Sequence, residues 1–266
     1  MKLFYRKIGE HKPVLIILHG LYGASDNWMS IAKTWSTNYE IFLVDLRNHG
    51  QSPHSNIHSY KAMRDDILKL MNDCKIKKAI VLGHSMGGKV AMRLAMDNPE
   101  RINNLIVVDI APKNYELIND QNVSKHQKIL KGMLALDLKL LKRRKDISQL
   151  LSASISNEKT KQFIMKNLKR NKDQSFSWKL NVETINKEIL NITKGFSENE
   201  IKKNISGFPV LFIKGEKSNY ILEEDYKQIL DIFPTAEFEV IRNAGHWIHA
   251  EQPEIISTLV KGFLEE

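Results

Sequence analysis

Short apolar runs that alternate with helix-like segments occupy the first 110 and the last 60 residues of the chain. A continuous apolar run is typical of a strand buried on both faces of a parallel sheet. Runs of this kind predict strands at residues 3–8, 13–18, 40–45, 78–82, 104–109, 208–213 and 237–241. Apolar residues at helical spacing predict helices at residues 26–36, 60–72, 88–96 and 253–263. The alternation predicts an α/β fold with a mostly parallel central sheet covered by helices on both faces.

The stretch between Asp109 and Phe208 follows a different pattern. It contains no convincing strand, and its Leu, Ile and Met residues recur at helical spacings, as at residues 129–141. We interpret residues 112–207 as an inserted helical lid over the carboxyl ends of the strands, and residues 1–111 and 208–266 as the core. A chain of 266 residues can bury such a core without disulfides or a structural metal.

The net charge of +9 is confined to this predicted lid. Residues 112–207 hold 20 Lys and Arg against 10 Asp and Glu, whereas the rest of the chain holds 20 against 21. Surfaces that bind nucleic acid interleave basic residues with exposed aromatics, and the lid has few aromatics. We therefore expect no nucleic-acid partner. The basic run at residues 142–145 is interpreted as a solvated helix face, with recognition of an anionic substrate as the alternative.

The distribution of apolar residues predicts a protein without stable membrane insertion. No N-terminal stretch combines a basic start, an apolar core and a small-residue cleavage site. No run approaches the length of about eighteen apolar residues that a spanning helix needs. Cys74 is the only cysteine, so no internal disulfide can form. We expect a cytoplasmic protein, and the sequence leaves its oligomeric state open.

The strongest chemical signal is Gly83-His84-Ser85-Met86-Gly87, which lies between a predicted strand and a predicted helix. In this context G-x-S-x-G predicts a nucleophile elbow, a sharp turn in which small residues on both sides of the serine avoid a backbone clash. The amide of Met86 then lies at a helix N-terminus, facing the place where a negative oxygen develops. Ser85 is the candidate nucleophile, and Met86 is a candidate oxyanion-hole donor.

A serine nucleophile needs a base in hydrogen-bond reach and an acid that orients this base. The fold that carries this elbow supplies them in the chain order Ser, acid, His. His246, after the last predicted strand, is therefore the candidate base. The fold often has its Asp near residue 218, which is Ser here, so Asp109 at the end of the preceding strand is the preferred acid. Glu216 is the main alternative, and Asp225 is a weaker one.

The second oxyanion donor is expected from the loop at residues 19–23, which follows the strand at 13–18. Leu21 has the best-placed amide in this loop. No acidic or Cys cluster accompanies His246 and His249 to complete a metal site. Glycine-rich phosphate motifs are absent as well. We therefore expect neither a metal nor a cofactor.

Motifs along the core resemble those of the α/β-hydrolase superfamily and, more narrowly, the YbfF-type bacterial esterases, relatives of a mitochondrial α/β hydrolase. These motifs lie at residues 19–23, 45–50, 83–89, 108–112 and 245–251. The resemblance implies a carboxylic ester hydrolase with a small helical lid. It also implies that Ser85, His246 and Asp109 are nucleophile, base and acid, and it makes acyl-CoA a candidate substrate.

From these observations we predict a serine carboxylesterase that hydrolyses a small carboxylic ester, or an acyl-CoA thioester, through an acyl-enzyme intermediate. One alternative is a hydrolase that uses the same triad to cleave a carbon–carbon bond. Another is a ligand-sensing protein that keeps the triad without turnover. Dehalogenase and epoxide-hydrolase chemistry is disfavoured, because those reactions need a carboxylate at the position of Ser85.

Overall fold

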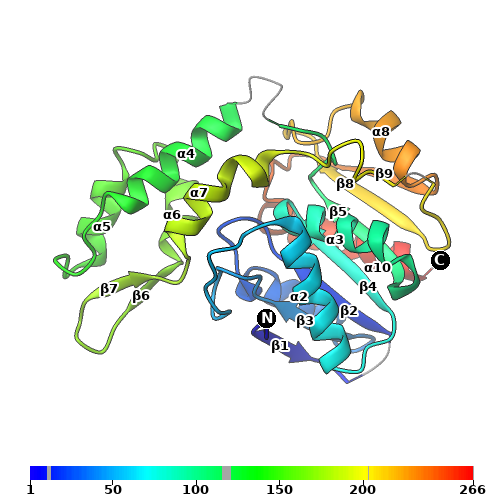
Figure 1. The fold of residues 1–266 in the computed structure, drawn as a ribbon, viewed down its shortest axis with the longest axis horizontal. Coiled ribbons are helices and arrows are strands. Elements are labelled where there is room, and N and C mark those ends of the chain that lie inside the picture. Colours follow the sequence, from blue (N-terminus) through cyan, green and yellow to red (C-terminus); the bar gives the residue numbers. More distant parts are fainter. Residues whose placement is uncertain (11–12, 116–120, 203, 266) are drawn as a thin grey trace.

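The computed structural model describes residues 1–10, 13–115, 121–202 and 204–265, and its centre is a seven-stranded sheet (Figure 1). The strand order is β1-β3-β2-β4-β5-β8-β9, and β1 pairs antiparallel with β3 while the other pairs are parallel. The strands are β1 (Tyr5–Ile8), β2 (Val14–Leu18), β3 (Glu40–Val44), β4 (Ala79–His84), β5 (Ile102–Val108), β8 (Val210–Gly215) and β9 (Ala236–Ile241). The predicted α/β fold with a mostly parallel sheet is confirmed.

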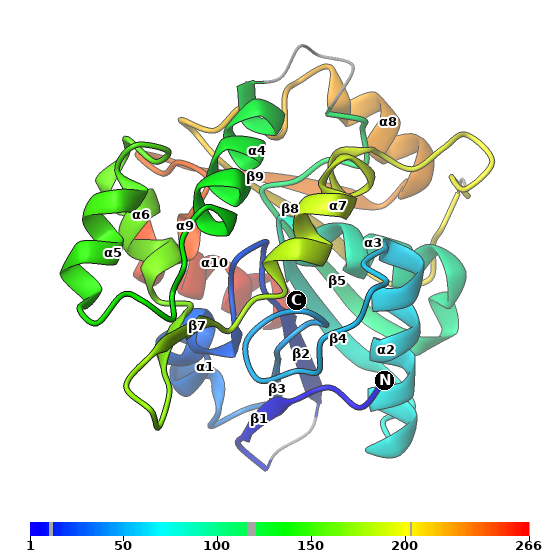
Figure 2. The ribbon, with the colours of Figure 1, turned by 60° about the vertical axis from the view of Figure 1, so that its left-hand side comes forward.

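Helices cover both faces of this sheet (Figures 1 and 2). The core helices are α1 (Met29–Trp35), α2 (Tyr60–Asp73), α3 (Met86–Asp97), α8 (Asp225–Ile232), α9 (Ile248–Glu251) and α10 (Pro253–Glu265), with 3-10 helices at Ser25–Trp28 and Pro99–Arg101. Neighbouring residues of β2 point to opposite faces of the sheet: Ile16 packs in a cluster with α2 and α3, whereas Ile17 packs in a second cluster with α1 and α10. Because both faces are covered, the strands are continuous apolar runs in the sequence. In the part of the chain that the structure describes, no helix has the length and apolar character needed to cross a membrane.

Residues 112–207 supply a further group of elements, which lie together beside the core in Figure 1. They are α4 (Gln121–Leu134), α5 (Arg144–Leu151), α6 (Glu158–Met165), β6 (Leu168–Arg170), β7 (Phe176–Trp178) and α7 (Val182–Thr193). Most of their buried apolar side chains form a hydrophobic cluster of their own, into which Tyr22 of the core packs, whereas Ile192 of α7 packs in a cluster of the core. We keep the division into core and lid as a proposal and call residues 112–207 the lid.

The prediction that no strand lies between Asp109 and Phe208 is wrong, because β6 and β7 form an antiparallel hairpin. Each strand has only three residues, which is too short to show an alternating pattern. The turn between them is closed by polar side chains, since Asp173 accepts hydrogen bonds from the amide and the hydroxyl of Ser175. Gln174 has a φ of 67° there, a conformation that sequence reasoning does not expect of Gln.

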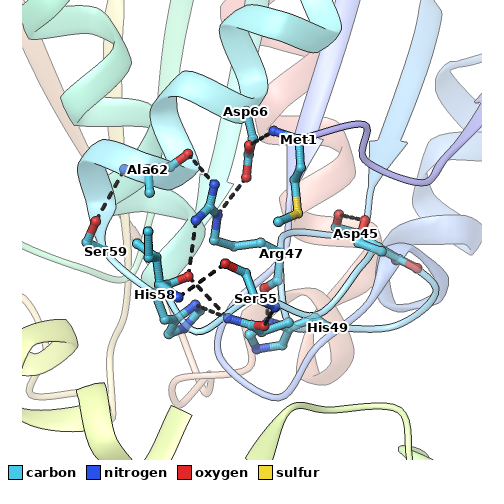
Figure 3. A network of polar contacts seen from close by, with 12 residues as sticks. Met1, Asp45, Arg47, His49, Ser55, His58, Ser59, Ala62 and Asp66 are labelled. Carbon is cyan, nitrogen blue, oxygen red and sulfur yellow. Dashed lines mark hydrogen bonds and ion pairs between the residues drawn. The ribbon is translucent and has the colours of Figure 1, made fainter. Parts of the chain in front are cut away.

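A buried ion pair fixes the loop after β3 (Figure 3). Arg47 Nε lies 2.7 Å from Asp66 of α2, and the guanidinium also donates to the carbonyl oxygens of Ile57 and Ala62. The amino group of Met1 contacts the same carboxylate. His19 ties this loop to the loop after β2, because its Nε2 accepts from the amide of Leu46 at 3.0 Å. The network therefore ties the loop after β3 to α2 and, through His19, to the loop after β2.

Lys89 of α3 joins two segments of the lid to the core. Its ammonium donates to the carbonyl oxygens of Lys113 at 3.1 Å and of Lys194 at 2.7 Å. The side chain is buried, and the Tyr115 ring centroid lies 4.8 Å from Nζ. Burial, reinforced by the nearby Lys113 cation, lowers the pKa of Lys89 from 10.5 to about 7.

Lys89→Met should therefore change how stability depends on pH. Between pH 7 and 10.5 the unfolded chain binds a proton at Lys89 that the folded chain does not, so the wild type becomes more stable as pH rises through this range. The variant lacks this contribution. We expect the free energy of unfolding of the wild type, relative to the variant, to increase by about 2 kcal/mol from pH 7 to pH 9. Urea unfolding of both proteins at pH 7 and pH 9 measures this change. If wild type and variant differ in free energy of unfolding by the same amount at both pH values, the expected effect of Lys89 is contradicted.

Candidate active site

Ser85 occupies a sharp turn between β4 and α3. Its backbone has φ 53° and ψ −120°. A Cβ atom at Gly83 would lie 2.3 Å from the carbonyl oxygen of Gly87, and one at Gly87 would lie 2.4 Å from that of Leu18. Neither position has room for a side chain, which explains the two glycines of the pattern. The structure thus places Ser85 in the strand-to-helix turn that the sequence predicts.

The loop after β9 brings His246 to Ser85. Nε2 of His246 lies 3.0 Å from Ser85 Oγ, and Nδ1 lies 2.7 Å from Oδ2 of Asp109. Asp109 directly follows β5 and is fully buried, and its other oxygen accepts from the amide of Gly215 at 3.1 Å. The three residues that the sequence predicts as nucleophile, base and acid are therefore joined by hydrogen bonds.

The two alternative candidates for the acid, Glu216 and Asp225, contact residues other than His246. Glu216 accepts from the amide of Asn243 at 2.8 Å, and Asp225 forms an ion pair with Lys113 at 2.7 Å. Ser218, where the fold often has an Asp, contacts Oδ2 of Asp109 through its hydroxyl. Ser218 therefore occupies the usual position of the acid, and its hydroxyl donates to the carboxylate of Asp109.

Three side chains hold the loop that carries His246. His84 Nε2 donates to the backbone oxygen of His246 at 2.8 Å, and burial lowers the pKa of His84 well below its usual range, which keeps this ring neutral. Glu251 accepts from the amides on either side of His246, and the Tyr220 ring stacks on the imidazole with centroids 3.9 Å apart. Glu251 and Tyr220 could not be recognised from the sequence, because nothing in their local pattern indicates that they contact this loop.

His249, three residues after His246, is packed in the core. Its ring stacks on Trp28 with centroids 4.7 Å apart, and burial lowers its pKa to about 3. Among the residues that the structure describes, no group of three or more His, Cys, Asp or Glu could hold a metal ion. His249 is thus a neutral part of the wall of the candidate site.

A cavity of about 460 Å³ lies beside Ser85, with walls from the core and from the lid. The lid contributes His126 and Phe163 among others. Three lysines, Lys125, Lys159 and Lys217, also line it. The basic run at residues 142–145 does not: Arg143 pairs with Asp146, and Arg144 donates to backbone oxygens of the lid. The positive charge at the cavity therefore comes from residues outside that run.

The two predicted oxyanion-hole residues lie next to Ser85. Met86 is the first residue of α3, and Leu21 shares the wall of the cavity with Ser85. The loop before Leu21 approaches the elbow closely, because a Cβ atom at Gly20 would lie 2.9 Å from Nδ1 of His84 and 3.1 Å from Cβ of Ser85. The amides of Leu21 and Met86 thus belong to backbone segments that meet at the serine.

Gly20→Ala should lower kcat/KM for an ester substrate by roughly ten- to a hundredfold, because the new methyl group pushes the loop of Leu21 away from Ser85 and a shift of about 1 Å costs that much. Steady-state kinetics with 4-nitrophenyl butyrate measures the loss. Gly262→Ala in α10 is the matched control, since no atom lies within 4 Å of its added Cβ. Equal activity of the two variants would contradict the close approach of this loop.

A seven-stranded sheet with a serine at the elbow after β4 and a histidine after β9 defines the class of the protein. The chain belongs to the alpha/beta hydrolase fold family, whose family model matches residues 13–253.

The names of similar proteins indicate that the chain is an esterase or lipase within this family. The chain is 35% identical over 254 residues to a putative esterase/lipase of Haemophilus influenzae, covering 96% of this chain and 84% of that protein. It is 31% identical over 252 residues to esterase YbfF of Escherichia coli, covering 95% and 93%. A solved marine microorganism esterase matches with a TM-score of 0.93 and 40% identity, covering 98% and 99%. The predicted resemblance to YbfF-type esterases is confirmed.

Proposed function

We propose that this protein is a serine carboxylesterase that hydrolyses small carboxylic esters through an acyl-enzyme intermediate. The observation that carries the proposal is the hydrogen-bonded chain from Ser85 Oγ through His246 to Asp109, which opens onto a cavity of about 460 Å³. A serine hydroxyl becomes an effective nucleophile when a histidine within hydrogen-bond reach removes its proton. The esterase names of the relatives agree with this chemistry.

In the first step, Ser85 Oγ attacks the carbonyl carbon of the ester while Nε2 of His246 takes the hydroxyl proton. Asp109 accepts from Nδ1–H of His246, which keeps Nε2 free to act as the base and stabilises the imidazolium. The amides of Leu21 and Met86 donate to the oxyanion of the tetrahedral intermediate. His246 then protonates the leaving alkoxide, the ester C–O bond breaks, and the acyl group stays on Ser85.

In the second step, water attacks the acyl carbon and gives a proton to His246. The bond between the acyl carbon and Oγ breaks, and His246 returns its proton to Ser85. The products are a carboxylic acid and free enzyme. No group outside the chain and the two substrates, ester and water, is needed.

An acyl-CoA thioester is a second candidate substrate, favoured by Lys125, Lys159 and Lys217 in the cavity wall. The phosphates of CoA are anionic, and ammonium groups attract them. These lysines are exposed, so salt should screen the attraction. An uncharged ester has no such interaction to lose.

Hydrolysis of 4-nitrophenyl butyrate and of butyryl-CoA at about 50 mM and 500 mM NaCl tests both candidates. Many turnovers of the ester per enzyme are expected, with little effect of salt. For butyryl-CoA, the higher salt should raise KM several-fold. If salt changes KM by the same factor for both substrates, the proposal that the cavity lysines attract the CoA phosphates is contradicted. Failure to turn over either substrate would contradict the esterase, and cleavage of a diketone instead would favour the carbon–carbon hydrolase.

A further inference from the structure

Ser85 lies where two cavities of very different size meet. The larger has a volume of about 460 Å³ and is lined by His246 and Trp247. The smaller has a volume of about 40 Å³ and is lined by Met86 and Ile192. Ser85 belongs to both walls, whereas His246 lines only the larger cavity.

The reaction decides which part of an ester enters which cavity. His246 protonates the leaving alkoxide, so the alcohol side of the ester lies next to His246 and extends into the larger cavity. The carbonyl oxygen faces the amides of Leu21 and Met86. The remaining substituent on the carbonyl carbon is the acyl tail, and it points away from His246. Ser85 and Met86 line the smaller cavity, and His246 does not.

We infer that the smaller cavity is the acyl-binding pocket and that the substrates are esters of short acids, from acetate to about butyrate, with a bulkier alcohol. This inference rests on the proposed function. A group the size of a water molecule or a methylene needs about 10–15 Å³ of cavity volume, so the pocket holds roughly three such groups. A butyryl tail has three carbon atoms beyond its carbonyl carbon. Apolar side chains, among them Leu21, Ile110 and Ile192, supply surface for a hydrocarbon tail.

Buried hydrogen bonds at the base of the lid resist widening of this pocket. The carbonyl oxygen of Ile192 accepts from the Tyr60 hydroxyl at 2.6 Å, and that of Thr193 accepts from the amide of Tyr115 at 3.1 Å. One residue further, the carbonyl oxygen of Lys194 accepts from Lys89. A longer acyl chain would have to displace Ile192 and leave these buried groups without partners, which is unfavourable. The pocket should therefore exclude long chains.

The test is kcat/KM of the full chain for the 4-nitrophenyl esters of acetate, butyrate, hexanoate and octanoate. We expect the optimum at acetate or butyrate, and a value for octanoate at least about tenfold below that for butyrate. An octanoate value equal to or above the butyrate value would overturn the short-acid pocket while leaving the esterase in place. Absence of hydrolysis with all four esters would contradict the esterase and the pocket together.

Two substitutions change the size of the pocket in opposite directions. Ile192→Ala enlarges it and should raise the hexanoate-to-butyrate ratio about tenfold, whereas Val123→Phe fills it and should lower the butyrate-to-acetate ratio by a similar factor. Phe163→Ala is the matched control, because Phe163 lines only the larger cavity and its loss should leave both ratios unchanged. Melting temperatures identify a variant that fails to fold, in which case the other variant decides. If a folded Ile192→Ala or Val123→Phe variant keeps the wild-type ratio, the assignment of the smaller cavity as the acyl-binding pocket is overturned.

Discussion

Replacing Ser85 with Ala should reduce kcat/KM for 4-nitrophenyl butyrate by about four to six orders of magnitude, as loss of the nucleophile does in a serine protease. Without Oγ no acyl-enzyme can form, and His246 has no hydroxyl proton to take at 3.0 Å. The remaining rate would come from the amides of Leu21 and Met86 and from binding alone. Hydrolysis followed at high enzyme concentration measures a loss of this size.

Ser218→Ala provides the matched control for that experiment. Ser218 also belongs to the site, but its hydroxyl contacts Asp109 instead of His246. Its removal takes one donor from the carboxylate and leaves the nucleophile intact, so a loss of roughly tenfold is expected. A Ser85→Ala variant that keeps more activity than Ser218→Ala would exclude Ser85 as the nucleophile.

Asp109→Asn should reduce kcat by about 10⁴, the size of the effect of the same exchange in a serine protease. The amide of Gly215 donates to Oδ1, so the oxygen of Asn stays on that side and its NH2 group faces Nδ1 of His246. This NH2 group donates to Nδ1, so the imidazole adopts the wrong tautomer and its charged form loses a counterion. The variant should keep a folded structure, since Asn is isosteric with Asp. Single-turnover kinetics with the butyrate ester separates this loss from slow product release.

Glu216→Gln tests the alternative acid in the same assay. Glu216 is exposed and accepts from the amide of Asn243, so its neutralisation should change kcat by no more than a few-fold. The reverse order, with the large loss in Glu216→Gln and the small one in Asp109→Asn, would show that Glu216 is the acid.

The candidate triad could be predicted because each of its members is tied to the end of a strand. Ser85 follows β4, Asp109 follows β5 and His246 follows β9 after a short loop. Carboxyl ends of parallel strands meet at one edge of the sheet, so apolar runs and chain order were sufficient to bring these residues together.

Contacts between distant segments could not be predicted in the same way. Tyr220 stacks on His246, and Lys89 reaches carbonyl oxygens of Lys113 and Lys194, through packing that no local pattern encodes. The hairpin of β6 and β7 could not be predicted, because a strand of three residues shows no periodicity. The size of the two cavities likewise depends on how the lid packs against the core.

The charge of the lid shows what a count of residues leaves open. Residues 112–207 carry the surplus of positive charge, but their basic run at 142–145 lies outside the cavity walls. Two lysines of the lid that do line the cavity, Lys125 and Lys159, lie outside any run of consecutive basic residues. Their positions depend on the orientations of α4 and α6, which charge patterning does not determine.

The central claim, a serine nucleophile that turns over esters, is tested most directly by fluorophosphonate labelling with peptide mapping, run beside the hydrolysis assay. We predict one adduct per chain, located on Ser85, with loss of butyrate ester hydrolysis in proportion to labelling and no adduct in Ser85→Ala. Labelling of a different residue, or full labelling of Ser85 in a protein whose ester turnover persists, would contradict the account.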